Sequence, residues 1–526
     1  MGDLSQEDAW PTGAASTILP TPPPRRPPVT SSTLCNLSAT EALAQLQAQA
    51  ISSRDLLEAC ITRVDTLNPQ LNAVVSQNRS AARARADEAD QATRRGERWG
   101  PLHGLPMTLK DAWEVPGMPC VGGAPEYRHH QPSHAGPAIR SVLNAGAIVW
   151  GKTNVPYKSL DVQTYNPVFG TTNNPWDAGK TCGGSSGGAA VAVATGITPL
   201  EVGSDIGGSI RIPAHFCGVY GHKATHGLIS LRGHVPGEPG SVSEPPLAVA
   251  GPMARTADDL QLLFDILAAP APAMQPGWTV SLPQPPHQRI DPYRVLIWVD
   301  DPDCPIDAGM AELYRQLGQK LKAAGVQVDT GSPLGLGLKD IYPLYFAQLG
   351  SVMGAWLRPD ERRARGMVAP FGRATSPILK ALSRRVGLPH STDQFVRGMT
   401  TGLGDWFKLV EQGNRLREAF CTVFGRYDVL LMPPTYTPAF AHDHGFTATR
   451  RITVDGVRRH YSDLFMWIAP ATLMGLPATS APVGRTAEGL PVNVQIVGAP
   501  YQDRMTMRFA KLLAGVMGGF VAPPMG

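Results

Sequence analysis

Apolar side chains recur at helical spacing in the early part of the chain. One such segment begins at Ser52 or Ser53, and its stripe predicts an amphipathic helix with a serine cap. The stripe consists of Leu56, Leu57, Cys60, Ile61 and Val64. Upstream, Ser38 has capping-box spacing before an Ala- and Leu-rich segment, and ordered structure is expected to begin near Leu37. Residues 77–95 predict a third, alanine-rich helix.

From Gly104 onward the pattern changes to short apolar runs separated by glycine turns and helical stretches. Apolar runs of this length that alternate with helices are typical of a mixed β-sheet with helices on its faces. A Pro-rich linker is expected at 270–292, followed after one more run by a helix over 306–324. The runs lie at 106–111, 147–153, 191–198, 295–300, 428–435 and 491–500. The pattern therefore predicts the α/β class.

The composition is that of a large globular protein with a short atypical beginning. The chain has 526 residues, of which 43% are hydrophobic, so a sizeable core can be buried. Residues 1–33 are rich in proline and predict a disordered lead-in. Residues 335–425 are largely helical in pattern and rich in large apolar side chains. No internal repeat is evident.

Charge and cysteine content exclude several classes of function. The net charge of +4 is too small to indicate binding to nucleic acid or to an anionic membrane. No apolar run approaches the roughly 18 residues that a membrane-spanning helix needs, so no membrane span is predicted. Seven scattered cysteines without CxxC spacing are typical of reduced thiols and predict a cytoplasmic protein.

The first of three competing motifs is GAIVWGKT at 146–153, which matches the phosphate-loop pattern GxxxxGK[ST]. A phosphate loop needs a flexible cradle of N–H groups followed by a helix. Here the middle residues have the pattern of a buried strand, and Pro156 blocks a regular helix after the lysine. We therefore interpret this segment as a core strand with a turn rather than a nucleotide site.

The second motif is GGSSGG at 183–188, which contains the nucleophile-elbow pattern GxSxG with Ser186 at its centre. An α/β-hydrolase-type serine esterase would also need an acid and a histidine downstream. Either Asp428 with His460 or the segment His442–His444 could supply them. However, an elbow follows a strong strand, and residues 171–182 are polar and rich in turns. The elbow remains an alternative mechanism.

The third interpretation combines the segments PMTLKD, CGGSSGG and GSDIGGSIR, which occur in this order and contain Lys110, Ser185 and Ser209. With these motifs and the 24-residue step between the two serines, the sequence resembles the amidase signature family of Ser-cisSer-Lys amide hydrolases. The similarity continues through GKTNVP, VFGTTNNPWD, APATLMGLPATSAPVG and PVNVQIVGAP. It covers roughly residues 37–515.

The resemblance implies the amidase signature fold, a large mixed, twisted central β-sheet covered on both faces by α-helices. Residues 34–526 would then form a single domain, with 335–425 as a helical substrate-pocket region. The aromatic and methionine side chains there indicate an apolar or aryl substrate, although ordinary helix packing would also explain them. By analogy with the family, Ser159 and Leu160 are expected near the acyl group of the substrate.

The resemblance also assigns roles in catalysis. Ser209 attacks the carbonyl carbon and carries the acyl group, while Ser185, which follows a cis peptide bond after Gly184, passes the proton of Ser209 to Lys110. A lysine can replace histidine as the base of a serine hydrolase only if its amine is neutral. Burial among the apolar residues of PMTLKD must therefore lower the pKa of Lys110 by roughly three units from about 10.4.

The glycines before Ser209 are explained by an oxyanion hole. The resemblance places the substrate oxygen against the backbone N–H groups of Ile206, Gly207, Gly208 and Ser209, and a Cβ atom at either glycine would obstruct that approach. A β-bulge without chemistry is the structural alternative. Three further residues of the motifs are expected to support the site by hydrogen bonding rather than proton transfer. These are Ser186, Asp205 and Arg211.

The expected partner is a small-molecule amide or carbamate, since family members hydrolyse amides and some act on esters or carbamates. A glutamine-hydrolysing amidotransferase subunit is the alternative within the family. Neither a metal nor a cofactor is predicted, because Pro132 interrupts the HxxxH spacing of His130 and His134, and His442–His444 has the pattern of a polar loop. The oligomeric state stays open, with a homodimer among the alternatives.

Overall fold

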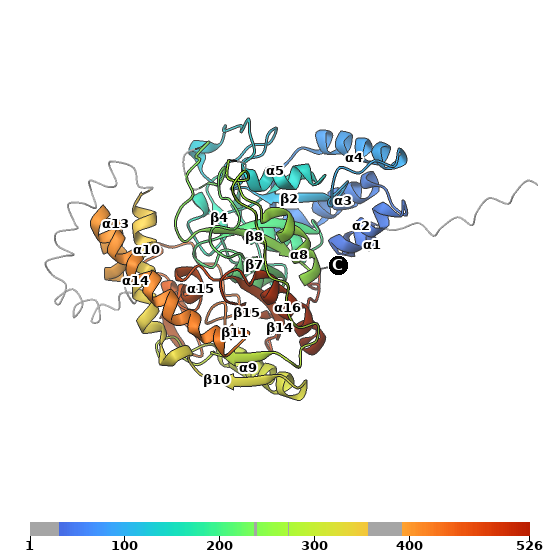
Figure 1. Ribbon diagram of the computed structural model, residues 1–526. Helices are drawn as coiled ribbons and strands as arrows, with labels where there is room; N and C mark the ends of the chain where they lie inside the picture. The colour runs from blue at the N-terminus through green and yellow to red at the C-terminus, as the bar shows by residue number, and fades with distance from the viewer. Residues whose placement is uncertain (1–30, 236–238, 272, 356–391, 526) are drawn as a thin grey trace, which may run out of the picture.

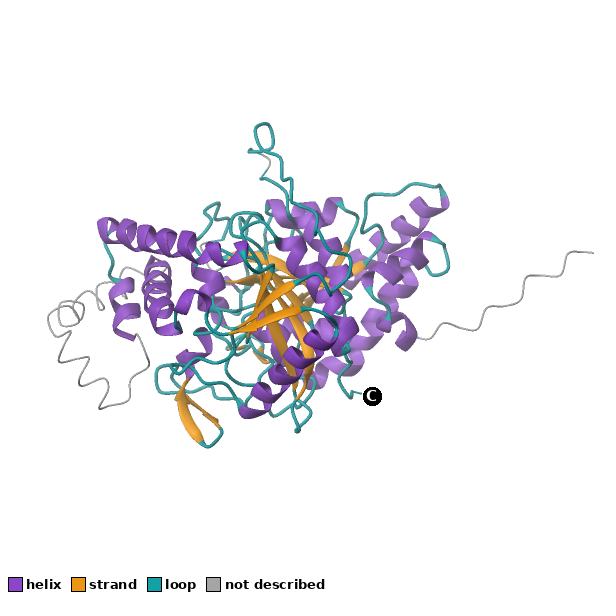
Figure 2. Cartoon of the chain, turned by 60° about the horizontal axis from the view of Figure 1, so that its bottom comes forward, coloured by secondary structure: helices purple, strands orange, loops and turns teal. Residues whose placement is uncertain are grey.

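The computed structural model describes residues 31–235, 239–271, 273–355 and 392–525. At its centre lies an eight-stranded sheet, with smaller sheets beside it (Figures 1 and 2). In spatial order the eight strands are β10 (Gln327–Thr330), β9 (Arg294–Ile297), β11 (Val429–Met432), β15 (Pro491–Val497), β14 (Ala478–Arg485), β7 (Tyr220–Lys223), β8 (Val249–Ala254) and β6 (Leu200–Asp205). Strand β9 is parallel to β10 and β11, and the remaining neighbours are antiparallel. The predicted mixed sheet is confirmed.

A three-stranded sheet carries Lys110, the last residue of its strand β2. Its order is β1-β3-β2, with β3 parallel to β2 and antiparallel to β1. The strands are β1 (Val74–Gln77), β2 (Pro106–Lys110) and β3 (Ile148–Thr153). The phosphate-loop match falls on β3, which extends through Thr153 with no helix opening at its lysine. Two hairpin-like pairs complete the β-structure: β4 (Tyr165–Asn166) with β5 (Gly170–Thr171), and β12 (Arg451–Val454) with β13 (Val457–His460).

Helices cover both faces of the central sheet. Apolar and polar side chains alternate along β15, and each set contacts helices on a different face. Val492, Val494 and Ile496 point into one apolar core, which they share with helices α8, α9 and α16. The intervening Asn493 and Gln495 point the other way, toward helix α7. These helices are α7 (Arg211–Cys217), α8 (Ala257–Leu267), α9 (Ala308–Ala323) and α16 (Asp503–Met517). The sheet is therefore the middle layer, as Figure 2 shows.

The remaining helices surround these layers. At the N-terminal end they are α1 (Ser31–Asn36), α2 (Ala39–Gln47), α3 (Ser53–Leu71), α4 (Arg79–Arg94) and α5 (Pro137–Asn144). Later in the chain they are α6 (Gly187–Ala194), α10 (Leu338–Ala355), α13 (Thr392–Met399), α14 (Leu403–Cys421) and α15 (Ala469–Leu473). Helices α10, α13 and α14 lie together at one end of the molecule in Figure 1. Short 3-10 helices are η1 (Pro125–Tyr127), η2 (Tyr157–Ser159), η3 (Pro333–Gly335), η4 (Thr422–Gly425) and η5 (Tyr461–Phe465).

Two features differ from the sequence prediction. Among the described residues, the first helix begins at Ser31 rather than near Leu37, because α1 packs its buried Leu34 and Cys35 into the same apolar core as α2. The pattern places the apolar run 191–198 among the short runs of the sheet region, yet half of it lies in α6. Every residue of α6 is buried, so the run lacks the amphipathic period that would mark a helix.

Parts of the domain prediction lie outside the described residues. These are 1–30 of the predicted lead-in and 356–391 of the predicted pocket region. Within the described residues, no helix is both long enough and apolar enough to span a membrane. A single domain over 34–526 stays a prediction.

Candidate active site

Three segments from different parts of the chain meet beside β6. Lys110 is the last residue of β2, Ser185 lies in the loop that leads into α6, and Ser209 lies in the turn between β6 and α7. The Lys110 side chain is fully buried, and Ser185 and Ser209 are 2% and 5% exposed. The peptide bond between Gly184 and Ser185 is cis, as the family resemblance implies.

Lys110 makes two hydrogen bonds with hydroxyl groups. Its Nζ lies 2.7 Å from the Oγ of Ser185 and 2.8 Å from the Oγ of Ser204. Burial lowers the pKa of Lys110 to about 7, although the nearby Asp205 and Glu201 carboxylates oppose the shift. An amine with this pKa is partly neutral near neutral pH and can therefore accept a proton from a hydroxyl group.

The position of Ser209 is set by its backbone. The Ser186 N–H donates to the Ser209 carbonyl oxygen at 3.1 Å, so the turn before α7 lies directly against the loop that carries Ser185. Among the described residues, no hydrogen bond joins the Ser209 hydroxyl to Ser185. The structure thus shows a hydrogen bond between Lys110 and Ser185. Proton transfer between Ser185 and Ser209 stays a prediction.

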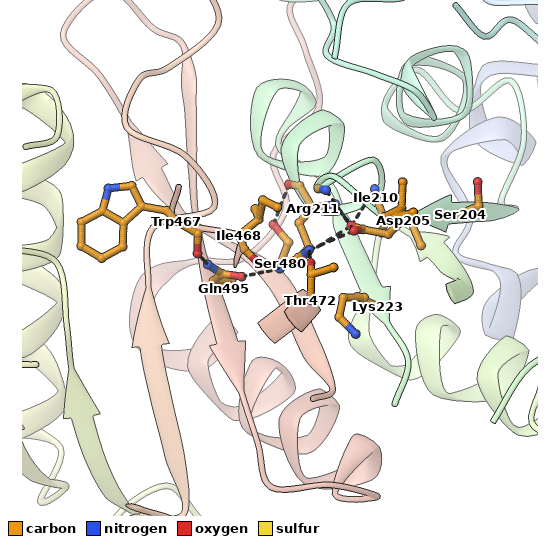
Figure 3. Close-up of polar contacts among 12 residues, drawn as sticks. Ser204, Asp205, Ile210, Arg211, Lys223, Trp467, Ile468, Thr472, Ser480 and Gln495 are labelled. Atoms are coloured by element: carbon orange, nitrogen blue, oxygen red, sulfur yellow. Dashed lines mark hydrogen bonds and ion pairs between the residues drawn. The ribbon is translucent and has the colours of Figure 1, made fainter. Parts of the chain in front are cut away.

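Asp205 and Arg211 hold this turn together (Figure 3). Both side chains are fully buried, and the Nη2 of Arg211 lies 2.9 Å from the Oδ1 of Asp205. Arg211 also donates to the Gln495 side chain, the Thr472 hydroxyl and the carbonyl of Ile468. Burial alone would raise the pKa of Asp205, but the charge and hydrogen bonds of Arg211 hold it below its ordinary value. The supporting hydrogen bonds expected of this pair are therefore present.

We predict that Arg211→Met lowers the free energy of unfolding by about 3–5 kcal/mol, because it leaves the buried Asp205 carboxylate without its counter-charge. Urea denaturation followed by circular dichroism measures the loss. Arg294→Met is the matched control, since Arg294 pairs with Asp428 while 42% exposed, and such a pair is worth about 1 kcal/mol or less. Equal losses for the two variants would contradict this reading of the Arg211 pair.

The predicted oxyanion donors differ in availability. The Gly208 N–H donates to the Oδ1 of Asp205 at 3.0 Å, so it is already engaged. No acceptor is found in the described part of the chain for the N–H groups of Ile206, Gly207 and Ser209. Of the four predicted oxyanion donors, three therefore have an N–H group that is free in the described structure, and their contact with a substrate oxygen stays a prediction. The β-bulge alternative is wrong, because β6 pairs with β8 in unbroken register up to its last residue, Asp205, and the glycines follow it.

The two glycines are explained by crowding and backbone conformation. A Cβ atom on Gly207 would lie 2.9 Å from Cε1 of Phe465, and one on Gly208 would lie 2.7 Å from Cδ1 of Ile212. Gly208 also has a φ of +83°, which side chains other than glycine rarely adopt. Protein side chains, and not only an approaching substrate, thus exclude a Cβ atom at both positions.

We predict that Gly208→Ala lowers the free energy of unfolding by more than the roughly 1–2 kcal/mol that a left-handed conformation costs, because the new methyl group meets Ile212. Gly227→Ala is the control, since Gly227 has a φ of +86° and open space around its Cα. Urea denaturation of both variants separates crowding from backbone strain. If Gly208→Ala lowers the free energy of unfolding no more than Gly227→Ala does, the side chains around Gly208 must rearrange to make room for the new methyl group.

The residues of the alternative nucleophile elbow are not brought together by their contacts. The Ser186 hydroxyl donates to the carbonyl of Ser204 at 3.4 Å. Asp428 pairs with Arg294 at the start of β11, and His460 ends strand β13. The hydrogen bonds of the described residues join none of these three to another, so the geometry does not support an elbow centred on Ser186.

The region expected to form the acyl pocket is only partly described. From α10, the hydroxyl of Tyr345 donates to the carbonyl of Ile206 at 2.9 Å, and Phe465 of η5 lies against Gly207. Phe346 packs with Phe465 at a ring separation of 6.2 Å, so an aromatic wall stands beside the turn that carries Ser209. Ser159 lies at the end of η2 with a positive φ, and Leu160 is 44% exposed. Their predicted contact with the acyl group stays a prediction.

Three polar residues at the site were given no role by the sequence analysis, namely Ser204, His234 and Glu201. Ser204 accepts from Lys110, and its Oγ lies 2.8 Å from Nε2 of His234. The position of Ser204 in GSDIGGSIR was a signal for its role, because β6 leads directly to Ser209, the predicted nucleophile. No sequence pattern pointed to His234. Glu201 accepts from two threonine hydroxyls, and burial raises its pKa to about 7.

The histidines considered as metal ligands have other contacts. His130 is engaged with Glu114, and His444 stacks on Tyr165 at a ring separation of 3.9 Å. Within the described ranges, no three or more His, Cys, Asp or Glu side chains are grouped so that they could hold a metal ion.

Comparisons with known proteins agree with this geometry. A glutamyl-tRNA(Gln) amidotransferase subunit of Anaeromyxobacter dehalogenans is 31% identical over 93% of the chain and 98% of its own length. An acylamidase of Rhodococcus erythropolis is 29% identical over 90% of the chain and 94% of its own length. A crystal structure of an amidase has a TM-score of 0.71 at 27% identity, covering 92% of this chain and all of that one. The amidase family model matches residues 55–507, so the chain belongs to the amidase family and is an enzyme that acts on amide C–N bonds.

Proposed function

We propose that the chain hydrolyses the C–N bond of a small amide through an acyl-enzyme on Ser209. The observation that carries this proposal is the 2.7 Å contact between the Nζ of Lys110 and the Oγ of Ser185. A fully buried lysine whose pKa burial lowers to about 7 is suited to proton transfer, whereas a purely structural lysine would more often pair with a carboxylate.

In the acylation half of the reaction, the Ser209 oxygen attacks the carbonyl carbon and loses its proton to Ser185. Ser185 passes its own proton to the neutral Lys110 amine. When the C–N bond breaks, the same relay returns a proton to the leaving nitrogen, so the amine departs neutral and Ser209 keeps the acyl group. In deacylation, water takes the place of the amine: it gives one proton to the relay, and its oxygen bonds to the acyl carbon. The bond between that carbon and the Ser209 oxygen then breaks, the relay returns the proton to this oxygen, and the acid leaves.

The negative charge that develops on the carbonyl oxygen is stabilised by backbone donors. We assign this role to the N–H groups of Ile206, Gly207 and Ser209, because Gly208 already donates to Asp205. The Asp205–Arg211 pair supports these donors by fixing the turn from both sides. One donor of this kind lowers the barrier by about 3–4 kcal/mol.

The aromatic wall of Tyr345, Phe346 and Phe465 favours an apolar or aryl substrate. Carbamates and esters offer the same carbonyl carbon to Ser209, so urethane hydrolysis belongs to the proposal. Glutamine hydrolysis as part of an amidotransferase is the second candidate, because relatives of both kinds are about equally similar, at 31% and 29% identity. These relatives therefore do not separate the two functions, and an assay must.

The test combines trapping and a substrate panel. The protein is incubated with anilides, aliphatic amides, aryl carbamates and glutamine, and the acyl adduct is located by peptide mass spectrometry. We expect an adduct on Ser209 with aryl or apolar substrates, and labelling of the same serine by a fluorophosphonate. Turnover of glutamine alone, and only with a partner chain present, would replace the stand-alone hydrolase with the amidotransferase. A chain that neither acylates nor reacts with the fluorophosphonate would contradict both.

A further inference from the structure

His234 ends a chain of hydrogen bonds that starts at the proposed proton relay. From Ser185 the chain runs to Nζ of Lys110 at 2.7 Å, then to Oγ of Ser204 at 2.8 Å, and then to Nε2 of His234 at 2.8 Å. Ser204 is therefore held between two nitrogen atoms. The direction of its single O–H bond decides which of the two nitrogen atoms, Nζ of Lys110 or Nε2 of His234, accepts the hydrogen bond from Ser204.

The neutral amine of Lys110 has only one lone pair. To act as a base, Lys110 must direct this lone pair at the hydroxyl proton of Ser185, and its two N–H bonds are then free to donate elsewhere. One of them is directed at Ser204. If the hydroxyl of Ser204 instead donated to Lys110, it would compete with Ser185 for the lone pair and weaken the base.

We propose that His234 is a positioning residue whose Nε2 accepts a hydrogen bond from the hydroxyl group of Ser204. The Ser204 hydroxyl is then not directed at Lys110, and the lone pair of Lys110 stays available to the hydroxyl proton of Ser185. This inference rests on the proposed function of Lys110 as the base. It requires that His234 carries its proton on Nδ1 and leaves Nε2 unprotonated. An imidazole protonated at Nε2 would reverse the Ser204 hydroxyl and direct it at Lys110.

The surroundings of His234 favour the neutral ring. Trp113 packs on it edge to face at a ring separation of 4.6 Å, and Trp113 is itself fixed by donation from its Nε1 to the carbonyl of Val202. Desolvation is the largest cause that holds the pKa of His234 well below its ordinary value, and the positive charge of Lys152 acts in the same direction. Lys110 adds to this effect only while it is protonated.

Carboxylates surround this group on the other elements. Glu201 and Asp205 of β6 act on Lys110, Asp111 lies 3.4 Å from Nζ of Lys152, and the N–H of Glu114 donates to the carbonyl of Gly233. None of these four carboxylates is a hydrogen-bond partner of the His234 ring in the described residues. The ring is therefore not paired with an acid there, as it would be in a Ser-His-Asp triad.

The first test observes the tautomer directly and needs no substrate. The full chain is labelled with ¹⁵N-histidine, and the imidazole nitrogens of His234 are assigned by comparison with His234→Gln. We expect an unprotonated Nε2 and a protonated Nδ1 at about pH 8, and a change in the Nε2 shift as Lys110 gains its proton, absent in Lys110→Met. A protonated Nε2 at that pH, or a pH response unaltered in Lys110→Met, would overturn the inference.

The second test uses kinetics. His234→Phe keeps the ring volume but removes the acceptor, and we expect kcat/KM to fall about tenfold, with the acid limb of its pH profile about half a unit lower, because Ser204 then donates to the neutral amine. His234→Gln, whose amide oxygen can accept, should recover most of the loss. In the Ser204→Ala background, His234→Phe should add nothing further.

The outcomes separate the two proposals. An unmoved pH profile in His234→Phe, or effects that multiply with those of Ser204→Ala, would overturn the role of His234 while leaving Ser209 acylation intact. Absence of any Ser209 adduct in the native protein, together with the expected Nε2 resonance, would overturn the proposed function and leave the hydrogen-bond chain established.

Discussion

Replacing Ser209 with alanine is expected to reduce amide hydrolysis by at least about 10⁴-fold and to remove the acyl adduct altogether. The physical reason is that covalent catalysis loses its nucleophile. Ser185 does not replace it, because its hydroxyl group is already hydrogen-bonded to Lys110 at 2.7 Å. The remaining rate would come from substrate binding and the oxyanion donors alone. The measurement is peptide mass spectrometry of the trapped adduct together with initial rates on the same anilide.

Two controls make this result specific. His460→Ala removes the histidine that an α/β-hydrolase elbow would need, and most fluorophosphonate labelling should persist in this variant. Thermal unfolding of Ser209→Ala should match that of the native protein, because the change deletes one oxygen from a side chain that makes no hydrogen bond in the described part of the structure. Labelling that survives in Ser209→Ala but disappears in His460→Ala would assign the nucleophile to Ser186 instead.

The fold was predictable where local patterns and burial agree. The predicted capping box of Ser38 is present, and α3 begins at the predicted serines with all residues of its predicted stripe buried. The prediction failed at α6, since a helix buried on all sides has the same apolar run as a buried strand. Strand order could not be predicted, because β14 and β7 become neighbours across more than two hundred residues of chain.

The site was predictable as far as its motifs reach. The contact between Lys110 and Ser185 was anticipated because both positions lie in segments that resemble one family, and the Asp205–Arg211 pair lies within the third segment. The engagement of the Gly208 N–H was not anticipated, since it depends on how the carboxylate of Asp205 turns back over the loop. His234 belongs to a separate loop, and only the folded chain brings it to Ser204.

Replacing Lys110 with methionine is expected to lower kcat/KM by about 10²–10⁴-fold and to remove the acid limb of the pH profile. In the native protein this limb should lie near pH 7, because burial lowers the pKa of Lys110 to about 7 and only the neutral amine can accept the proton of Ser185. Activity of the native enzyme should therefore rise with pH through this range. The measurement is a kcat/KM profile from about pH 5 to pH 9 for both proteins.

Lys223 offers a matched control for this variant. It is also fully buried, and burial likewise lowers its pKa to about 7. Its Nζ, however, donates to the carbonyl of Ala224 at 3.0 Å and contacts neither serine of the relay. Lys223→Met should therefore keep the acid limb that Lys110→Met loses. If both variants lose the acid limb, the limb depends on buried positive charge at either lysine. It would then not identify Lys110 as the base.

The stability of Lys110→Met provides an independent check on the charge of the buried amine. Burial moves the pKa of Lys110 from 10.5 to about 7, so between these values the unfolded chain binds a proton that the folded chain does not. The lysine therefore destabilises the native protein fully below about pH 7, and less and less as pH rises toward 10.5. Lys110→Met should accordingly gain stability over the native protein in urea denaturation near pH 6, and the gain should shrink by pH 9. A gain that stays the same from pH 6 to pH 9 would instead mean that the folded protein holds Lys110 charged over this range, as the unfolded chain does, and a charged ammonium group could not take the proton of Ser185.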